Sequence, residues 1–558
     1  MEKRLITAVT LSIITIVMFQ FLFPAPKKTQ AAKPEERAIV KEIDVKSFVP
    51  AMSIPTDGEK ESAVATDRSV VTFSDIGGAV KKIELKKHKK HNSIEPLILV
   101  EEKDPSRYIF SIKDSSGALP LESSKYSIGI KPNQHFDPST LLRVDGEQRR
   151  TIDKLSADPE LLSKDQVIYT LNLKDLQIAK QYTLSNSNDT IELQLFIKNT
   201  SAQPKELAYQ IISGSGIVEP NMADKRLIEV TAKVDGKTVN FKRPKNNIIT
   251  NPGIVSWVAL KTRYFSLIMK PFGQTKQQFH NFAIGDDLVA GIEMERVTIP
   301  ADSFIEQKYL LYAGPSIASE LKKIGMEFEE TINYGFFGWI AKALLFMLGL
   351  CHSVVKSWGL SVIILSVLLN VLLFPLTLKS FQSMQKMHEL HPQMEKLKAQ
   401  FKDNPQKLNK EVMELYKKYN INPLGGCLPL LLQMPIFIAL YQALTKSIDL
   451  RGASFLWIKD LSMPDAVAIP ATLPLIGNHI NILPLAMVVL MVFQQKVSTK
   501  VMGSAVTEEQ KQQQKMMLIM MPVMFGFIFY SMPSGMVLYW VVNTLLTIVE
   551  QSAILKKT

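Results

Sequence analysis

Cysteine is scarce in this chain of 558 residues, which contains only Cys351 and Cys427. Neither belongs to a Cys-x-x-Cys pattern, so the sequence offers no disulfide framework and no thiolate metal site. Both lie in apolar stretches, where we expect unreactive thiols. The apolar runs also lack paired aspartates, a His-Glu-x-x-His pattern and a Gly-x-Ser-x-Gly elbow. These absences argue against an intramembrane hydrolase, and we expect neither enzymatic activity nor a cofactor.

The net charge of +12 is not accompanied by an Arg-rich patch or a nucleic-acid motif, which argues against nucleic acid as a partner. Much of the excess is lysine placed beside apolar runs, where it sets the orientation of membrane spans. Apolar residues make up 46% of the chain, but the long uncharged runs gather in the C-terminal part, while residues 25–330 are polar and mixed. This asymmetry predicts one soluble domain joined to one membrane domain.

The N-terminus carries an apolar run of 19 residues at 5–23. It is longer than the core of a signal peptide and close to the ~20 residues that span a bilayer. No Ala-x-Ala cleavage site follows it. We therefore predict an uncleaved transmembrane anchor at residues 1–24, with Lys3 and Arg4 in the cytoplasm. Residues 25–65 are rich in Pro, Ala, Lys and Glu and predict a flexible linker.

Short runs of alternating apolar and polar residues fill positions 66–315 and predict strands. Examples are VVTFSDIGG, QVIYTLNL and TIELQLFIKN, each bounded by turn-forming residues. No helical pattern of comparable length interrupts them. We predict an all-β sandwich, which lies outside the cytoplasm if the anchor is oriented as argued.

Residues 316–359 predict amphipathic helices rather than spans. Four apolar residues share one helical face in the first part, namely Ile317, Leu321, Ile324 and Phe328. The following stretch, residues 334–358, is apolar but interrupted by Lys342, His352 and Lys356. An interfacial helix fits this composition better than a buried span.

Five further transmembrane spans are predicted in residues 360–558, at about 360–378, 424–445, 471–496, 516–532 and 535–555. With the anchor they make six. Pro and Gly crowd the first half of the fourth span, whose continuous helix we expect to begin near Asn481. Lysines concentrate in residues 379–422, after the fourth span and at the C-terminus. This bias places these segments and both termini in the cytoplasm.

The cytoplasmic segment 379–422 predicts a hairpin of two amphipathic helices. The first carries Phe381, Met384, His388, Met394, Leu397 and Phe401 at helical spacing, and the second carries Leu408, Val412, Leu415 and Tyr419. Between them, DNP at 403–405 supplies a cap and a first-turn proline. A solvated connector is the alternative, but paired apolar faces argue against it.

Uncharged polar residues recur inside three predicted spans. Ser366, Asn370 and Thr377 share a face of the second span, Gln433 lies in the third, and Tyr539, Asn543 and Thr547 follow one face of the last. One interpretation is ordinary interhelical hydrogen bonding, worth about 0.6 kcal/mol per bond. The other is a polar cavity between the spans, which stripes on several helices favour. Methionines of the fifth span suit promiscuous apolar contact or ordinary filling.

Several segments resemble the YidC/Oxa-type membrane protein insertases. NPLGGCLPLLLQMPIFIALYQAL at 422–444 closely resembles the signature of their third span, and FPLTLKSFQSMQKM at 374–387 and MPSGMVLYWVVNTLLTIVEQ at 532–551 resemble flanking segments. WVALKTRYF at 257–265 and YAGP at 312–315 are similar to the Gram-negative YidC branch.

The resemblance implies a bacterial inner-membrane insertase and chaperone with a periplasmic β domain. Such proteins insert newly made membrane proteins, alone or beside the Sec translocon, without consuming nucleotide. The implied partners are nascent membrane proteins, the translating ribosome, the Sec translocon and the lipid bilayer. A hydrophilic groove, open to the cytoplasm and to lipid, receives the polar part of the substrate.

The resemblance also implies site residues, with one departure. Most members carry an arginine five residues before the proline that stands here at Pro375, and this chain has Asn370 there. An amide can hydrogen-bond a substrate but offers no charge attraction to acidic residues. The expected groove comprises Asn370, Ser366, Thr377, Gln433, Tyr539, Trp540 and Asn543, and the expected apolar substrate contacts are Met520, Met524 and Phe527.

Two rival functions remain from the residues alone. A polytopic transporter or channel with a periplasmic accessory domain would be expected to show repeated halves, and no internal symmetry is visible. A structural periplasmic tether would make the β domain essential and the polar stripes dispensable.

Overall fold

The computed structural model describes residues 58–90, 93–130, 166–218, 227–241, 249–273, 277–284, 287–401, 404–419, 428–473, 477–502 and 508–555. All of them belong to one compact unit, Ile54–Thr558. The predicted anchor at 1–24, the linker up to residue 57 and Cys427 lie outside the described residues.

The strands of the β domain are, in chain order, β1 Glu61–Ala65, β2 Ser69–Ser74, β3 Ala79–Lys89, β4 Pro96–Glu101, β5 Ile112–Asp114, β6 Ser127–Ile130, β7 Gln166–Asn172, β8 Leu176–Leu184, β9 Thr190–Asn199, β10 Lys205–Leu207, β11 Tyr209–Gly214, β12 Glu229–Val234, β13 Lys237–Phe241, β14 Ile249–Gly253, β15 Val255–Lys261, β16 Phe265–Pro271, β17 Gln277–Ile284, β18 Asp287–Met294, β19 Val297–Ile299 and β20 Phe304–Pro315. β1 lies within the predicted linker, where its Val64 pairs with Val71 of β2 and is buried.

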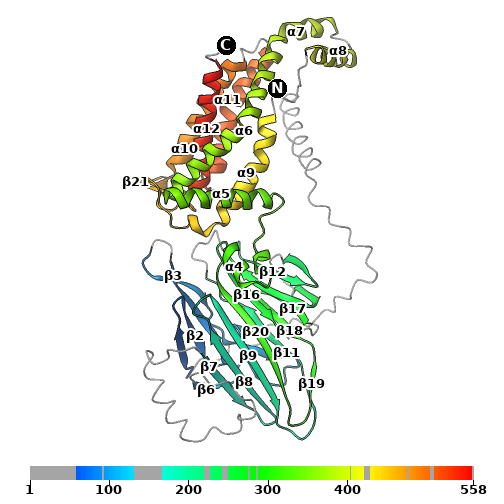
Figure 1. Ribbon diagram of the computed structural model, residues 1–558, viewed down its shortest axis with the longest axis vertical. Helices are drawn as coiled ribbons and strands as arrows, with labels where there is room; N and C mark the ends of the chain where they lie inside the picture. The colour runs from blue at the N-terminus through cyan, green and yellow to red at the C-terminus, as the bar shows by residue number, and fades with distance from the viewer. Residues whose placement is uncertain are drawn as a thin grey trace. The chain divides into compact units, whose positions relative to one another are not determined.

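The two larger sheets enclose one apolar core, so the predicted all-β sandwich is confirmed (Figure 1). The nine-stranded sheet has the order β13-β12-β15-β16-β20-β9-β8-β7-β6, and the five-stranded sheet has the order β14-β17-β18-β11-β5. Leu193 and Leu195 of β9 and Ile211 and Ile292 of the smaller sheet belong to this core. Because side chains alternate along a strand, every second residue of β9 reaches it.

A fully buried lysine lies within the sandwich. The Lys180 ammonium of β8 donates hydrogen bonds to the carbonyl oxygens of Gly77 and Phe110, at 2.6 and 2.7 Å. Its neighbour Tyr182 donates through its hydroxyl to the carbonyl of Gly78, at 2.7 Å. Burial lowers the pKa of Lys180 to about 7. Both glycines have positive φ, so the Gly-Gly turn presents carbonyls to strand β8 in a conformation that other residues disfavour.

After β20 the chain packs back onto the nine-stranded sheet. Helix α4, Ala318–Ile324, and the 3₁₀ turn η5, Phe328–Thr331, bury Leu321 and Phe328 against Trp257. The predicted apolar face is thus confirmed for these residues. The helical spacing is not one continuous helix, because Gly325 takes a positive φ and ends α4.

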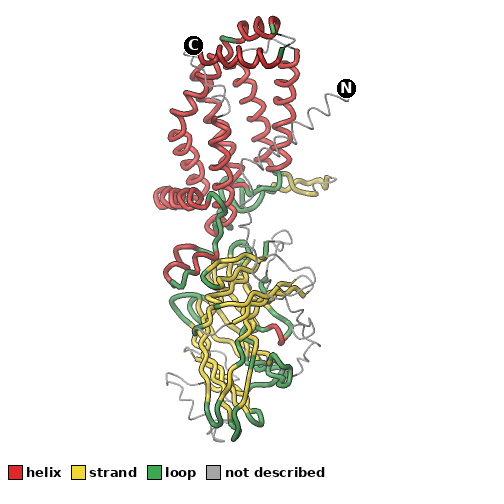
Figure 2. The backbone as a smooth tube through the Cα atoms, turned by 90° about the vertical axis from the view of Figure 1, so that its right-hand side faces the viewer, coloured by secondary structure: helices red, strands yellow, loops and turns green. Residues whose placement is uncertain are grey.

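The C-terminal part is helical. Its helices are α5 Gly338–Val355, α6 Trp358–Glu389, α7 His391–Gln400, α8 Pro405–Lys418, α9 Leu428–Lys446, α10 Ile482–Met502, α11 Glu508–Phe529 and α12 Ser534–Leu555. Helices α6, α9, α10, α11 and α12 run side by side, and α5 lies across them (Figures 1 and 2). They share an apolar core that includes Leu344, Leu365, Leu440, Met487 and Val537. Cys351 is a buried free thiol in α5.

Among the described residues, three helices are long and apolar enough to cross a membrane. They are α5, Trp358–Ser383 of α6 and Ile482–Thr499 of α10, and α11 adds the shorter apolar stretch Leu518–Phe529. The predicted six-span count therefore stays a prediction. The sequence predicts an interfacial helix where α5 lies, and by length and composition α5 also qualifies as a span.

The fourth predicted span, 471–496, is wrong in its first half. Residues there form a small hairpin of β21, Val467–Leu473, and β22, Gly477–Ile480, and α10 begins at Ile482, as the expectation near Asn481 implied. The prolines and glycine of this stretch disfavour a helix and are typical of a turn.

The predicted first hairpin helix is divided. Phe381, Met384 and His388 continue α6, which ends at Glu389, and only the later residues form α7. Asn404 caps α8 as expected, since its side chain accepts from the Lys407 amide. The contact between α7 and α8 is centred on Leu390 and Tyr416, with Met394, Val412 and Leu415 packed around them. Tyr416 therefore takes the place predicted for Tyr419, which is exposed.

Candidate functional site

The centre of the candidate site is a hydrogen bond between two amide side chains on different helices. Asn370 of α6 donates through Nδ2 to Oδ1 of Asn543 of α12, at 2.9 Å. Both side chains are half-buried. Among the described residues, Asn370 Oδ1 and Asn543 Nδ2 have no protein hydrogen-bond partner. An acceptor and a donor thus remain for another molecule.

A second hydrogen bond ties α9 to α12. Gln433 Nε2 donates to the hydroxyl of Tyr539, at 2.9 Å. Tyr539 is 1% exposed, whereas Gln433 is half-buried. Tyr539 and Asn543 are four residues apart on α12, so the two hydrogen bonds follow one face of that helix. We call Asn370, Asn543, Gln433 and Tyr539 the amide row.

Two predicted groove residues bond within their own helix. Ser366 Oγ donates to the Val362 carbonyl at 2.7 Å and is fully buried, and Thr377 Oγ1 donates to the Leu373 carbonyl at 3.1 Å. Thr547 similarly donates to the Asn543 carbonyl at 2.8 Å. These hydroxyls are satisfied internally, so they add polarity beside the amide row without linking helices.

Trp540 belongs to an aromatic cluster instead. Its ring lies 5.2 Å from that of Phe437, 5.6 Å from Phe525 and 5.1 Å from Phe529, centre to centre. The neighbouring Tyr539 points into the amide row, and a helix turns 100° between adjacent residues. In the sequence only the four-residue spacing of Phe525 and Phe529 marks this cluster, and that spacing does not by itself predict it.

The predicted apolar contact residues lie on the outside of α11. Met520, Met524 and Phe527 are 55%, 46% and 85% exposed. Their spacing of four and three residues places them on one face. On α6, Val371 and Leu372 are likewise exposed next to Asn370. Large exposed apolar side chains on long helices suit contact with lipid or with an apolar substrate segment.

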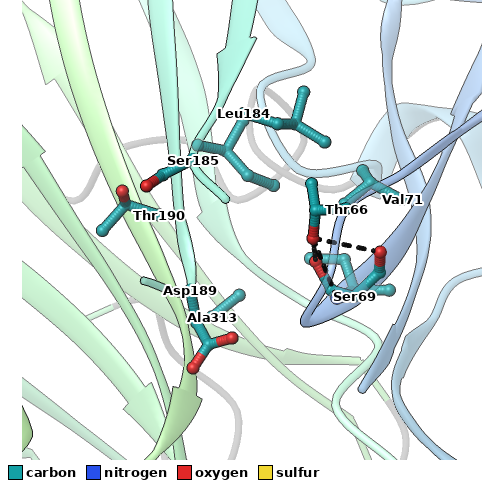
Figure 3. Close-up of a pocket in the computed structure, with 10 residues that line it drawn as sticks. Thr66, Ser69, Val71, Leu184, Ser185, Asp189, Thr190 and Ala313 are labelled. Atoms are coloured by element: carbon teal, nitrogen blue, oxygen red, sulfur yellow. Dashed lines mark hydrogen bonds between the residues drawn. The ribbon is translucent and has the colours of Figure 1, made fainter. Parts of the chain in front are cut away.

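A small pocket lies in the described part of the β domain (Figure 3). Its polar side chains are those of Thr66, Ser69, Ser185, Asp189 and Thr190. The Thr66 and Ser69 hydroxyls bond each other, and the Asp189 carboxylate accepts two hydrogen bonds from Arg68. Most of these polar groups therefore already have hydrogen-bond partners within the protein.

The comparisons with known proteins cover the whole chain. Residues 350–558 match the family described as 60Kd inner membrane protein, and residues 142–347 match the YidC periplasmic domain. The chain is 32% identical over 580 residues to the membrane protein insertase YidC of Geotalea daltonii, with 100% of this chain and 99% of the relative covered. Its identity to the YidC of Citrifermentans bemidjiense is 32% over 587 residues, with coverages of 100% and 99%.

Among solved structures, an active YidC insertase with its first transmembrane domain resolved is 17% identical. It aligns with 88% of this chain and 92% of its own, at a TM-score of 0.34. The relatives, matched over their full length at about one-third identity, confirm the resemblance stated from the sequence. The chain belongs to the family of YidC membrane protein insertases.

Proposed function

We propose that this chain inserts newly made membrane proteins into the bacterial inner membrane and helps them fold, with the amide row as its polar contact for substrate. The observation that carries the proposal is the half-buried Asn370–Asn543 pair with an acceptor and a donor left over. A polar segment that enters an apolar bundle needs such partners, because unsatisfied polar groups there cost several kcal/mol.

The proposed groove is neutral. Asn370, Ser366, Thr377, Gln433, Tyr539 and Asn543 supply amides and hydroxyls, with Trp540 beside them. Both interhelical contacts of the amide row are amide–amide or amide–hydroxyl bonds. Substrate recognition would therefore rest on hydrogen bonding and lowered desolvation cost, and not on attraction to acidic residues. The apolar segment of the substrate would leave along Met520, Met524 and Phe527.

The proposed topology has six spans with both termini in the cytoplasm. It comprises the anchor at 1–24, a linker at 25–65, a periplasmic β domain at 66–315, interfacial helices at 316–359 and the core at 360–558. Lysine-rich residues 379–422, which include α7 and α8, would face the cytoplasm and receive the nascent chain from the ribosome. The Sec translocon and lipid complete the proposed partners. The chain would act without chemistry of its own.

Insertion by purified protein in proteoliposomes tests the proposal. Wild-type protein should insert a single-span substrate with a polar translocated tail, and Asn370→Leu should reduce the rate about 5-fold, the effect of roughly 1 kcal/mol. Val371→Leu changes the exposed neighbour and should leave the rate unchanged. Equal rates for the two variants would contradict the role of the amide row, and solute flux through the reconstituted protein would favour a transporter or channel.

A further inference from the structure

The segment between α9 and the β21–β22 hairpin forms a compact cap tied to the ends of several helices. We call residues 447–466 the cap. The backbone carbonyls of Asp460 and Leu461 accept hydrogen bonds from the start of α12, from the Ser534 hydroxyl at 3.1 Å and from the Gly535 amide at 2.8 Å. Asp465 Oδ2 accepts from the Leu483 amide in the first turn of α10, at 2.9 Å. The cap therefore sits at the level where α10 and α12 begin.

A tight turn projects from this cap. Phe455 and Ile458 exchange two backbone hydrogen bonds of 2.9 Å, which leaves Leu456 and Trp457 as a two-residue tip. Ile458 is 1% exposed, while Leu456 and Trp457 are 75% and 47% exposed. The stem is thus anchored in protein, and both side chains of the tip are exposed.

The backbone of this tip is unfavourable for a leucine. Leu456 has a φ of +52° at the first central position of the turn, where glycine is the usual residue. A branched apolar residue is unfavourable in this region, so turn formation alone does not explain leucine. The stem is fixed on α6, because Phe455 packs so close to Gly359 that an added Cβ would lie 2.1 Å from its ring.

Trp457 has the amphipathic arrangement found at membrane interfaces. Its indole nitrogen donates to Asp465 Oδ2 at 3.2 Å, the same oxygen that caps α10. The ring remains half exposed, and the exposed Lys459 follows two residues later. A tryptophan beside a lysine at the end of a span is typical of the headgroup boundary, where the ring meets lipid and the ammonium meets phosphate.

We infer that Leu456 and Trp457 insert into the lipid headgroup–acyl boundary at the ends of α6 and α10. Three observations indicate that lipid is what contacts the tip. The tip lies at the end of two helices that can span a membrane, the exposed Leu360, Ile482 and Leu485 lie in the first turns of these helices, and Lys459 is two residues from the tip. The inference rests on the proposed function only in that the bundle crosses a bilayer. An anchored cap would hold the starts of α6, α10 and α12 at one depth.

A probe at the tip tests the inference. Full-length Leu456→Cys is labelled with the fluorophore NBD and placed in nanodiscs of phosphatidylethanolamine and phosphatidylglycerol. Labelled wild type, which retains Cys351 and Cys427, gives the background. Val489→Cys on the exposed face of α10 serves as the lipid control, and Lys237→Cys on exposed β13 as the water control.

Lipid nitroxide at acyl carbon 5 should quench the probes at 456 and 489 at least 2-fold more than the probe at 237, and aqueous iodide should do the reverse. Iodide quenching at 456 without nitroxide quenching would overturn the inference. Protection from both quenchers would also overturn it and indicate that a second protein surface covers the tip. Failure of the Val489 control would instead contradict the membrane bundle itself, so the two proposals fail separately.

The native tryptophan gives a second readout that needs no label. The emission difference between wild type and Trp457→Phe isolates Trp457. Brominated phosphatidylcholine should reduce this difference at least 2-fold relative to unbrominated lipid. An unchanged difference in a bilayer that quenches Trp339, which is exposed on α5, would contradict insertion of the tip.

Discussion

The β domain and the helical bundle use polar and apolar side chains in opposite ways. In the β domain even a lysine is buried, with its ammonium hydrogen-bonded to two carbonyls, and most of the buried apolar residues belong to one core. In the bundle, apolar residues such as Phe527 and Val371 are exposed, while amides lie half-buried between helices with groups left over. This inversion is the one expected for water around the first region and lipid around the second, as in the proposed topology.

The difference indicates that substitutions of polar residues affect mainly stability in the β domain and mainly substrate contact in the bundle. In the sandwich, removal of one buried polar group leaves others unsatisfied, so stability responds strongly. In the bundle, the amide row holds only two interhelical bonds worth about 0.6 kcal/mol each, so stability responds weakly while substrate contact responds strongly. Substitutions in the two regions should therefore separate an effect on stability from an effect on insertion.

The largest expected effect is on the β domain. Lys180→Ala would leave the carbonyls of Gly77 and Phe110 without a donor and open a cavity, which should lower the free energy of unfolding of that domain by about 3–5 kcal/mol. Urea unfolding of the full chain, followed by the fluorescence of the buried Trp257, measures it. Insertion by the folded fraction should stay within about 2-fold of wild type. An unchanged free energy of unfolding of the β domain would contradict the proposed difference between the two regions.

A charge on the exposed face of α11 should be nearly as costly in a bilayer. Phe527→Asp places a carboxylate against lipid and should lower the thermal stability of the bundle in nanodiscs by about 2–3 kcal/mol. Phe527→Leu is the matched control and should change little. If Phe527→Asp is as stable as the control, this face does not contact lipid.

The pH dependence of the β domain follows from Lys180. Its pKa in the folded state is about 7, below its value in the unfolded chain, so between these values the unfolded state binds more protons. Stability should therefore rise with pH, by about 2 kcal/mol from pH 7 to 9, and be insensitive to this group below pH 6. Urea unfolding at several pH values tests this, and Lys180→Met should flatten the profile.

The smallest expected effect concerns charge in the groove. Asn370→Arg would add a cation beside Asn543 and should raise the insertion rate of substrates with acidic translocated tails about 2- to 5-fold over the same substrates with neutral tails. Wild type should treat both tails alike. The insertion rates of the paired substrates in proteoliposomes measure this, and a strong preference of wild type for acidic tails would contradict a neutral groove.

The sequence predicted the composition of each region better than its contacts. Alternation along β9 and the apolar face of Leu321 and Phe328 followed from spacing alone, because burial of one face sets both patterns. Spacing also placed Asn370 and Asn543 on polar faces. The spacing does not predict the hydrogen bond between Asn370 and Asn543, which are 173 positions apart, because helix packing decides which faces meet.

The wrong predictions come from local backbone events. Helix α6 continues to Glu389 instead of ending at the predicted span boundary, and β21 replaces the start of the fourth span. Trp540, which the resemblance places in the groove, packs its ring with Phe437 and Phe525. Adjacent residues of a helix point to different faces, so a helical position alone does not say what a side chain contacts. An apolar stretch interrupted by proline and glycine can form either a turn or a helix, and tertiary packing decides which.

Photocrosslinking from two adjacent positions tests the account most directly. A photoreactive residue would replace either Asn370 in the amide row or Val371 on the exposed face, and ribosomes stalled while making a single-span membrane protein would present the substrate. The account predicts strong crosslinks to the polar segment of the nascent chain from position 370 and predominantly lipid adducts from position 371. Equal nascent-chain crosslinks from both positions, or crosslinks from the outer face of α11 without any from position 370, would show that the amide row is only a contact between helices.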